Sequence, residues 1–201
     1  MSTIHADQGR ARRRSVRFAA RTALIAALRV ALLAALGVAL LAGCGGSNQT
    51  SGGPLIAADK RTVAPNVKGL LLGGGTFDLA AHKGQVVVIN FWASNCPPCR
   101  TEAPELEATY SATKGQGVEF LGISVRDERD KAISYLTDIK APYGSLFDPA
   151  GEFALDFQVP PTTIPSTLVV DRQGKLASVF RGAVYQKQLE PVIRDLLAEP
   201  S

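Results

Sequence analysis

The chain has 201 residues, which is long enough for one domain with a substantial hydrophobic core and appended segments. Its formal net charge of +4 arises in residues 1–43, which hold seven arginines and one acidic residue. From residue 44 onward there are 15 basic and 17 acidic residues, so the body of the chain is mildly acidic and a nucleic-acid partner is not expected.

Residues 1–43 have the pattern of an export signal rather than of a folded segment. An arginine-rich stretch precedes the uncharged apolar run VALLAALGVALLA, residues 30–42. This run is too short for a helix that crosses a bilayer, which needs about 20 residues. A membrane anchor that starts at Ala19 and is interrupted by Arg29 is the alternative.

The apolar run ends in LAGC, residues 41–44, which resembles the lipobox of bacterial lipoproteins. The resemblance implies that residues 1–43 are removed as a lipoprotein signal peptide and that Cys44 carries the lipid. The mature protein would then be anchored at the extracytoplasmic face of the cell membrane, where disulfides persist. The residues that follow are rich in Gly, Ser and Asn, and we expect residues 44–62 to form a flexible tether.

Residues 63–198 have the alternating pattern of one α/β domain. The expected elements are two short strands around a glycine turn at 66–79, a buried strand at 85–93, a helix at 97–114, a buried strand at 118–125, a helix at 128–140, a short strand and a short helix within 141–157, a strand hairpin at 166–171 and 175–182, and a last amphipathic helix around 189–197. We expect Asp127 to cap the helix that follows it and Pro104 to kink the helix that contains it.

Cys96 and Cys99 follow directly after the expected buried strand. With Cys96 at the start of a helix and Cys99 one turn in, their Cβ atoms would lie ~5–6 Å apart, close to the ~3.5–4.5 Å of a disulfide. The helix N-terminus also stabilises a thiolate at Cys96. We therefore predict a redox pair in which an exposed Cys96 attacks a substrate disulfide and a more buried Cys99 resolves the mixed disulfide.

Two structural uses of the cysteine pair are weaker alternatives. A structural zinc site needs four ligands, and the chain after Cys44 offers only His82 in addition, which we expect in a surface loop. A purely structural disulfide that closes so short a loop would constrain the unfolded chain very little. We therefore expect no metal at this pair.

The segment FWASNCPPCRTEAPEL, residues 91–106, resembles the active site of thioredoxin-fold proteins, and more closely that of the TlpA/ResA-like thiol–disulfide oxidoreductases. The resemblance covers residues 63–198 and includes the stretches KGQVVVINFWA, GVEFLGISV and IPSTLVVDRQGKL. It implies a thioredoxin-like three-layer α/β/α sandwich with a short N-terminal β-hairpin extension. It implies no bound cofactor.

The same resemblance assigns roles to residues around the pair. Pro165 matches the family's cis-proline, which faces the two cysteines and presents its backbone to the substrate. The substrate groove is expected to include Trp92, Pro97, Pro98 and Ile164, with Trp92 serving partly in packing.

Glu102 matches an acidic residue that this family uses near its active site. We expect it to exchange a proton with Cys99 and to disfavour a nearby thiolate by its charge. Asn90 stands where cytosolic thioredoxins have a buried aspartate, which leaves Glu102 as the expected proton acceptor. A solvated glutamate on the helix surface is the alternative.

These features predict an anchored enzyme that exchanges disulfides with exported proteins. The resemblance favours a reductant that a transmembrane thiol electron carrier recharges, and keeping apocytochrome c cysteines reduced for haem attachment is one such role. A disulfide-forming oxidase on the same fold is the leading alternative, because the direction depends on the reduction potential.

A thiol peroxidase and a copper chaperone are less favoured. A peroxidase of the peroxiredoxin type would need a Thr or Ser and an upstream proline at the positions that Ala93 and Ile89 occupy. A copper chaperone would need a wider cysteine spacing and a distal histidine, and no histidine follows His82.

Overall fold

A computed structural model describes residues 54–200 of the protein. The expected signal peptide, Cys44 and the first part of the expected tether lie outside these residues. None of the helices within residues 54–200 has the length and apolar character that a membrane crossing requires.

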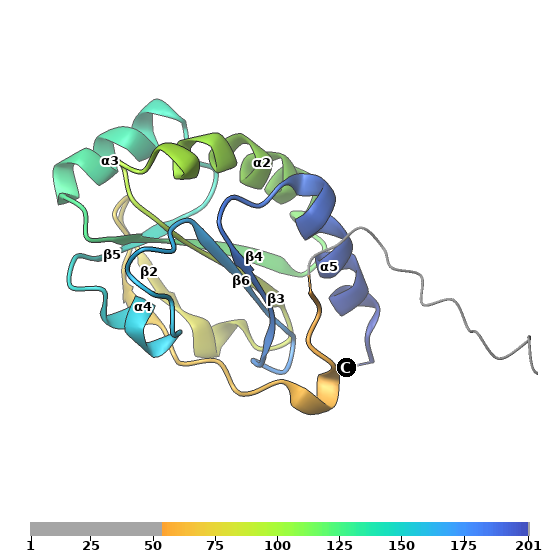
Figure 1. The fold of residues 1–201 in the computed structure, drawn as a ribbon. Helices are drawn as coiled ribbons and strands as arrows, with labels where there is room; N and C mark the ends of the chain where they lie inside the picture. The colour runs from red at the N-terminus through yellow and green to blue at the C-terminus, as the bar shows by residue number, and fades with distance from the viewer. Residues whose placement is uncertain (1–53, 201) are drawn as a thin grey trace, which may run out of the picture. The chain divides into compact units, whose positions relative to one another are not determined.

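The centre of the domain is a five-stranded sheet with the order β5-β4-β3-β6-β7 (Figure 1). Its strands are β3 (Val86–Trp92), β4 (Val118–Val125), β5 (Ser145–Asp148), β6 (Ser166–Val170) and β7 (Leu176–Arg181). β3, β4 and β5 are parallel, whereas β6 and β7 run antiparallel to their neighbours. All residues of the central strand β3 are buried, as its nearly unbroken apolar run predicted.

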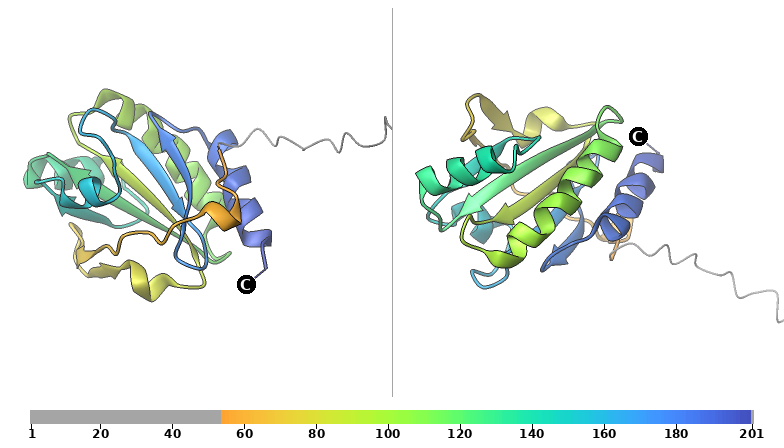
Figure 2. Two further views of the ribbon diagram at one scale, coloured as in Figure 1. Left: turned by 60° about the horizontal axis from the view of Figure 1, so that its bottom comes forward. Right: turned by 90° about the horizontal axis from the view of Figure 1, so that it is seen from above.

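Helices and a hairpin cover the two faces of this sheet, which gives three layers (Figures 1 and 2). The helices α2 (Pro97–Thr113), α3 (Arg129–Asp138) and α5 (Gln186–Ala198) lie on one face. The short helix α4 (Glu152–Asp156) lies on the opposite face. The predicted α/β/α sandwich is confirmed.

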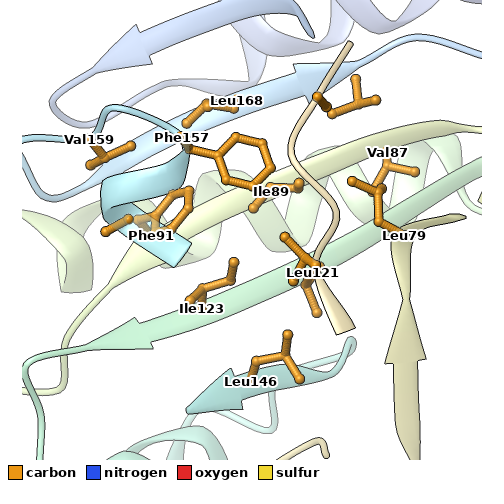
Figure 3. Close-up of a cluster of buried hydrophobic side chains, with 14 of the residues drawn as sticks. Leu79, Val87, Ile89, Phe91, Leu121, Ile123, Leu146, Phe157, Val159 and Leu168 are labelled. Atoms are coloured by element: carbon orange, nitrogen blue, oxygen red, sulfur yellow. The ribbon is translucent and has the colours of Figure 1, made fainter. Parts of the chain in front are cut away.

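Side chains that alternate along β3 divide the core into two halves. Val87, Ile89 and Phe91 join the cluster on the α4 side, where Phe157 packs over them (Figure 3). The even-numbered positions face the layer of α2 and α5, whose apolar stripe closes the other half. Asn90 belongs to the even set, so its polar side chain is directed toward α2 rather than toward solvent.

The predicted N-terminal extension is an antiparallel hairpin of β1 (Lys68–Leu70) and β2 (Thr76–Asp78). Its turn contains Gly74 and Gly75 with φ angles of 95° and 82°, a left-handed region in which residues with a Cβ are strained. Two short 3-10 helices, η1 (Ala58–Lys60) and η2 (Leu79–His82), flank the hairpin in the chain.

The other predicted elements are present with small shifts at their ends. The helix expected at 128–140 is α3, which ends earlier, at Asp138. Pro104 lies inside α2, where it has no N–H to donate to the preceding turn. The expected kink at Pro104 stays a prediction.

The described part of the expected tether packs on the domain instead of remaining free. Residues 54–63, named here the N-terminal strap, run beside β7, with isolated bridges from Leu55 to Ser178 and from Val63 to Lys175 (Figure 2). The predicted tether of residues 44–62 was therefore too long at its C-terminal end.

Arg61 explains why the strap is held. Its guanidinium is 3.1 Å from the carboxylate of Asp171 and pairs through two nitrogens with both carboxylate oxygens of Glu199, at 2.6 Å each. Its Nε also donates to the carbonyl of Ile56 over 2.9 Å. Two-pronged, charge-assisted bonds of this kind are the strong class of hydrogen bond. Both acidic partners are more than 100 residues away in the chain, so local composition could not predict this contact.

Candidate active site

The cysteine pair lies where the central strand ends and α2 begins. β3 ends at Trp92, a short loop follows, and Cys96 is the N-cap residue of α2, with φ −95° and ψ 105°. Pro97 and Pro98 occupy the first helical positions, where a missing N–H breaks no helical hydrogen bond. The N–H of Cys99 donates to Cys96 Sγ over 3.2 Å, so a backbone donor of the first turn points at the expected nucleophile.

Cys96 and Cys99 form a disulfide, with their Cα atoms 5.3 Å apart. This confirms that the pair closes within the first turn of the helix. Cys96 is 7% exposed and Cys99 is 4% exposed, so both are buried in the disulfide form and Cys96 is not the exposed residue that was expected. The reason is the loop before β6, since the carbonyl oxygen of Ile164 lies 3.9 Å from Cys96 Sγ.

The Ile164–Pro165 peptide bond is cis, as the resemblance implied. Pro165 is buried directly before β6, and its carbonyl oxygen accepts a hydrogen bond from Gly182 N over 2.8 Å. The backbone of Ile164 therefore faces the cysteine pair. Presentation of this backbone to a substrate stays a prediction.

The residues expected along the substrate groove fall into two groups. Pro97 and Pro98 are exposed and Ile164 is partly exposed, so these three lie on the surface around Cys96. Trp92 is only 5% exposed, because its even position on β3 directs it into the layer of α2 and α3.

Trp92 is thus a packing residue beneath the pair, and its assignment to the groove is wrong. Its Nε1 donates to Ser145 Oγ over 3.0 Å, and its ring lies 5.3 Å from that of Tyr135, centroid to centroid. The two cysteines belong to the same buried cluster.

Glu102 lies one turn beyond Cys99 and is only 2% exposed. Its Oε2 accepts a hydrogen bond from Asn90 Nδ2 over 2.8 Å. Its Oε1 accepts from the Val184 N–H over 2.9 Å and from Thr167 Oγ1 over 3.2 Å. The alternative of a solvated surface glutamate is excluded.

Burial raises the pKa of Glu102 from 4.5 to about 7, because the charged carboxylate loses its hydration. The hydrogen bonds from Val184, Asn90 and Thr167 favour the carboxylate and oppose this shift without cancelling it. A group that titrates near neutral pH and lies one turn from the pair is suited to accept and return a proton.

The sequence did not reveal the part of Thr167 in the site, nor the hydrogen bonds that Asn90 makes there. Asn90 and Thr167 are partners in the register of β3 and β6, and Asn90 Nδ2 also donates to Thr167 Oγ1 over 3.0 Å. Asn90 therefore has a role of its own, because it donates a hydrogen bond to Glu102, the expected proton acceptor of this site. The strand register that joins Asn90 and Thr167 could not be read from either segment alone.

Asp127 does not cap α3 as expected. The N-cap residue of α3 is Glu128, and no side chain caps it. The Asp127 carboxylate accepts from the Glu128 N–H over 2.8 Å, and otherwise from Ser94 N over 2.5 Å, from Ser94 Oγ over 2.7 Å and from Ser124 Oγ over 3.2 Å. Asp127 thus fastens the loop before Cys96 to the end of β4. These bonds to a residue 33 positions away compete with the local cap.

Behind the cysteine pair the structure contains a cavity of about 110 Å³ between α2 and α3. Its lining includes Asn90, Trp92, Cys99, Tyr135 and Ser145. Cys99 is part of its lining, whereas Pro97 and Pro98 are not.

His82 lies in η2 and packs on Phe77, with their rings stacked at 4.6 Å, so it is not in a surface loop. Its Nδ1 is 2.7 Å from Gln85 Oε1. Within residues 54–200, no group of three or more His, Cys, Asp or Glu side chains is placed to hold a metal ion.

A thioredoxin-like sandwich with a Cys-x-x-Cys disulfide at a helix N-terminus and a cis-proline beside it defines a thiol–disulfide oxidoreductase. The chain belongs to the AhpC/TSA family, whose model matches residues 61–179. The expected class of enzyme and its thioredoxin-like fold are thereby confirmed.

Several curated proteins are similar to this chain. The thiol:disulfide interchange protein HelX of Rhodobacter capsulatus is 31% identical over 152 residues, which cover 75% of this chain and 83% of HelX. The thiol:disulfide interchange protein DsbE of Pseudomonas aeruginosa is 36% identical, over 59% of this chain and 65% of DsbE. The thiol-disulfide oxidoreductase ResA of Bacillus thuringiensis is 31% identical, over 66% of this chain and 76% of ResA.

Solved structures agree with this class. A secreted thiol-disulfide isomerase from Corynebacterium glutamicum superposes with a TM-score of 0.69 at 31% identity, covering 77% of this chain and 96% of that one. A DsbF homologue from Corynebacterium diphtheriae gives a TM-score of 0.67 at 28% identity, covering 76% of this chain and 96% of the homologue.

Proposed function

We propose that this protein is a membrane-anchored reductant of disulfides in exported proteins, acting outside the cytoplasmic membrane. The observation that carries the direction is the buried Glu102 one turn from the cysteine pair. Its negative charge disfavours thiolates and so does not stabilise the reduced pair. A dithiol whose reduced form is not stabilised gives up its electrons more readily, in contrast to strongly oxidising pairs with stabilised thiolates.

The proposed reaction begins when the Cys96 thiolate attacks a substrate disulfide. A bond forms between Cys96 Sγ and one substrate sulfur, and the other substrate sulfur leaves with the electron pair. Glu102 then takes the proton of Cys99, whose thiolate attacks Cys96 Sγ, and the second substrate sulfur leaves with the electron pair. The two substrate thiolates are protonated by Glu102 and by solvent. The pair ends as the Cys96–Cys99 disulfide, oxidised by two electrons, and the substrate ends as a dithiol.

A transmembrane thiol electron carrier would return the two electrons by the same exchange in reverse. The substrates would be exported proteins, and one such substrate is apocytochrome c, whose cysteines must be reduced for haem attachment. The named relatives, which are thiol:disulfide interchange proteins and oxidoreductases, support exchange with protein thiols.

The direction is tested by the reduction potential of the Cys96–Cys99 couple. Trp92 is the single tryptophan of the chain and packs in the same cluster as both cysteines, so its fluorescence should report the redox state. Titration in thiol buffers should give a potential near the roughly −270 mV of thioredoxin. A value near the roughly −120 mV of a strong oxidant would establish the disulfide-forming oxidase instead.

The anchor is proposed at Cys44, where LAGC resembles a lipobox. The secreted state named for the Corynebacterium glutamicum isomerase supports export of this domain type. Mass spectrometry of the protein from its native membrane should find an acylated Cys44 at the N-terminus. A mature protein that still begins before residue 44 would contradict lipidation and favour an uncleaved segment.

A further inference from the structure

The turn that follows β4 lies beside the loop that leads to Cys96. Trp92, the last residue of β3, is the register partner of Ser124 near the end of β4. The chain therefore leaves the two parallel strands at neighbouring points of the sheet edge. After β3 it enters the loop of residues 93–95, and after β4 it enters Arg126 and Asp127, which are here named the β4 clasp.

Asp127 uses both of its carboxylate oxygens in this clasp. Its Oδ1 accepts from Ser94 Oγ over 2.7 Å and from the Glu128 N–H over 2.8 Å. Its Oδ2 accepts from the Ser94 N–H over 2.5 Å and from Ser124 Oγ over 3.2 Å. Each oxygen thus receives two donors. An asparagine of the same shape has one acceptor oxygen and an amide nitrogen that only donates, so it would lose two of these bonds.

Ser94 is the residue of the active-site loop that these bonds hold. It is only 4% exposed, and its carbonyl oxygen accepts from Arg100 Nε over 3.0 Å. The next turn of the loop is closed by the Cys96 N–H, which donates to the Ala93 carbonyl over 3.2 Å. The N–H, hydroxyl and carbonyl of Ser94 are therefore all bonded two residues before Cys96. A loop fixed in this way delivers Cys96 to the N-cap position in one orientation.

Arg126 holds the loop on the other side of the cysteine pair. Its guanidinium donates to the carbonyl of Pro161, in the segment that leads to Ile164. The carbonyl oxygen of Ile164 lies 3.9 Å from Cys96 Sγ. Arg126 has a φ angle of 49°, a left-handed conformation that is strained for a residue with a Cβ. Such strain persists where the surrounding contacts determine the backbone, and here consecutive residues bind the two loops that border Cys96.

We propose that Asp127 is a positioning residue for the exchange reaction, which holds the loop before Cys96 so that the attacking sulfur stays aligned with the N-terminus of α2. The Cys99 N–H, 3.2 Å from Cys96 Sγ, then remains directed at the sulfur when it is a thiolate. This inference rests on the proposed function in one respect, because it takes Cys96 as the attacking thiol. It applies to either direction of electron flow.

The sign of the effect on Cys96 separates positioning from charge. The charged and titratable groups around the loop come from α2, α3 and the clasp, and are Arg100, Glu102, Tyr135, Arg126 and Asp127. Residues 157–165 on the facing side contain no charged side chain. Loss of the negative charge of Asp127 would by itself lower the pKa of Cys96, because a carboxylate disfavours a nearby thiolate. Loss of alignment would raise this pKa toward the ~8.5 of a free cysteine.

The test is alkylation of the full-length reduced protein by iodoacetamide as a function of pH. Mass spectrometry of the labelled residues distinguishes Cys96 from Cys44 and Cys99. Asp127→Asn should raise the pKa of Cys96 by about one pH unit, against the effect of the lost charge. Below both pKa values the thiolate fraction falls about tenfold while each thiolate becomes more nucleophilic, so alkylation should slow about threefold.

Ser94→Ala removes the hydroxyl bond to Asp127 without changing any charge, so it should raise the pKa of Cys96 by a smaller amount. The double variant should shift the pKa by less than the sum of the two single shifts, because both substitutions break the same contact. Asp130→Asn is the matched control, since it removes the same charge from an exposed residue in the first turn of α3. It should leave the pKa of Cys96 unchanged or slightly lower.

A pKa of Cys96 that is unchanged or lower in Asp127→Asn, with the circular dichroism of the native protein, would overturn the positioning role. If Asp127→Asn does not fold, an unchanged pKa in Ser94→Ala overturns it equally. A wild-type protein in which Cys99 is alkylated at lower pH than Cys96 would instead overturn the roles that the proposed function gives to the two cysteines, and this inference with them.

Discussion

Cys99→Ser is expected to stop catalysis after one attack and to leave the substrate bound to Cys96 through a disulfide. Cys96 holds the N-cap position, with the Cys99 N–H directed at its sulfur, so it remains able to form a thiolate and attack. Without a second thiol one turn away, nothing within the pair can break the mixed disulfide. Turnover with a protein disulfide should fall by at least roughly a hundredfold.

The measurement is steady-state reduction of a model protein disulfide, together with non-reducing electrophoresis of the trapped adduct. Cys96→Ser is the control, since it should be equally inactive but should form no adduct. An adduct that accumulates in Cys96→Ser and is absent in Cys99→Ser would show that the roles of the two cysteines are reversed.

Glu102→Gln is expected to abolish a loss of about 3 kcal/mol in the free energy of unfolding that the wild type shows as the pH rises. The native pKa of about 7 lies above the ordinary value of 4.5, so between these two pH values the native state holds a proton that the unfolded state has lost. Wild-type stability therefore decreases as the pH rises through this window, and the loss is complete above pH 7. Glutamine has no proton to lose and avoids this cost.

The stability advantage of Glu102→Gln over wild type should therefore be about 3 kcal/mol larger at pH 8 than at pH 4. Urea unfolding of the oxidised proteins at both pH values measures it. Glu107→Gln, an exposed position on the same helix, is the control and should differ from wild type by less than about 0.5 kcal/mol at either pH. If the difference in stability between Glu102→Gln and wild type is the same at pH 4 and pH 8, the pKa of this carboxylate is not raised in the folded protein.

The same variant should slow the resolving step, because the amide cannot accept the proton of Cys99. A positioned base is worth roughly a hundredfold or more, and single-turnover release of the substrate thiol would show the loss. With the nearby charge gone, the thiols should also react with an alkylating agent at lower pH. Asn90→Asp in this background places a carboxylate on the other member of the hydrogen-bonded pair and should restore part of the rate.

Much of the fold could be predicted because its signals are local. The run from Val86 to Trp92 is apolar except for Asn90, which is more than an exposed strand tolerates, and the prolines after Cys96 suit the first turn of a helix. The surroundings of Glu102 could not be predicted in the same way. Its three donors come from β3, β6 and the segment before α5, up to 82 residues away, and only the folded sheet brings them together.

The wrong predictions for Asp127 and Trp92 also arose because their surroundings depend on segments that are distant in the sequence. Asp127 has the residue type and place of a helix cap, but a serine in the loop before Cys96 competes successfully for its carboxylate. Trp92 has the residue type and place of an active-site aromatic. Side chains alternate along β3, however, and the position of Trp92 directs its ring into the interior. In both cases the residue type was informative and the direction of the side chain depended on distant strands.

The packed N-terminal strap sets how far from the bilayer this enzyme can work, if Cys44 carries lipid as proposed. Ten peptide units separate Cys44 from Pro54, and a fully extended chain spans at most about 3.5 Å for each, or roughly 35 Å. Had the chain been free up to Val63, the limit would have been nearly twice as high, roughly 65 Å. Arg61 pairs with Asp171 and Glu199 and so holds the strap on the domain. These contacts thereby reduce the greatest distance that the enzyme can reach from the bilayer. Its substrates must therefore approach the membrane to within this distance, whereas an electron carrier embedded in the membrane already lies within it.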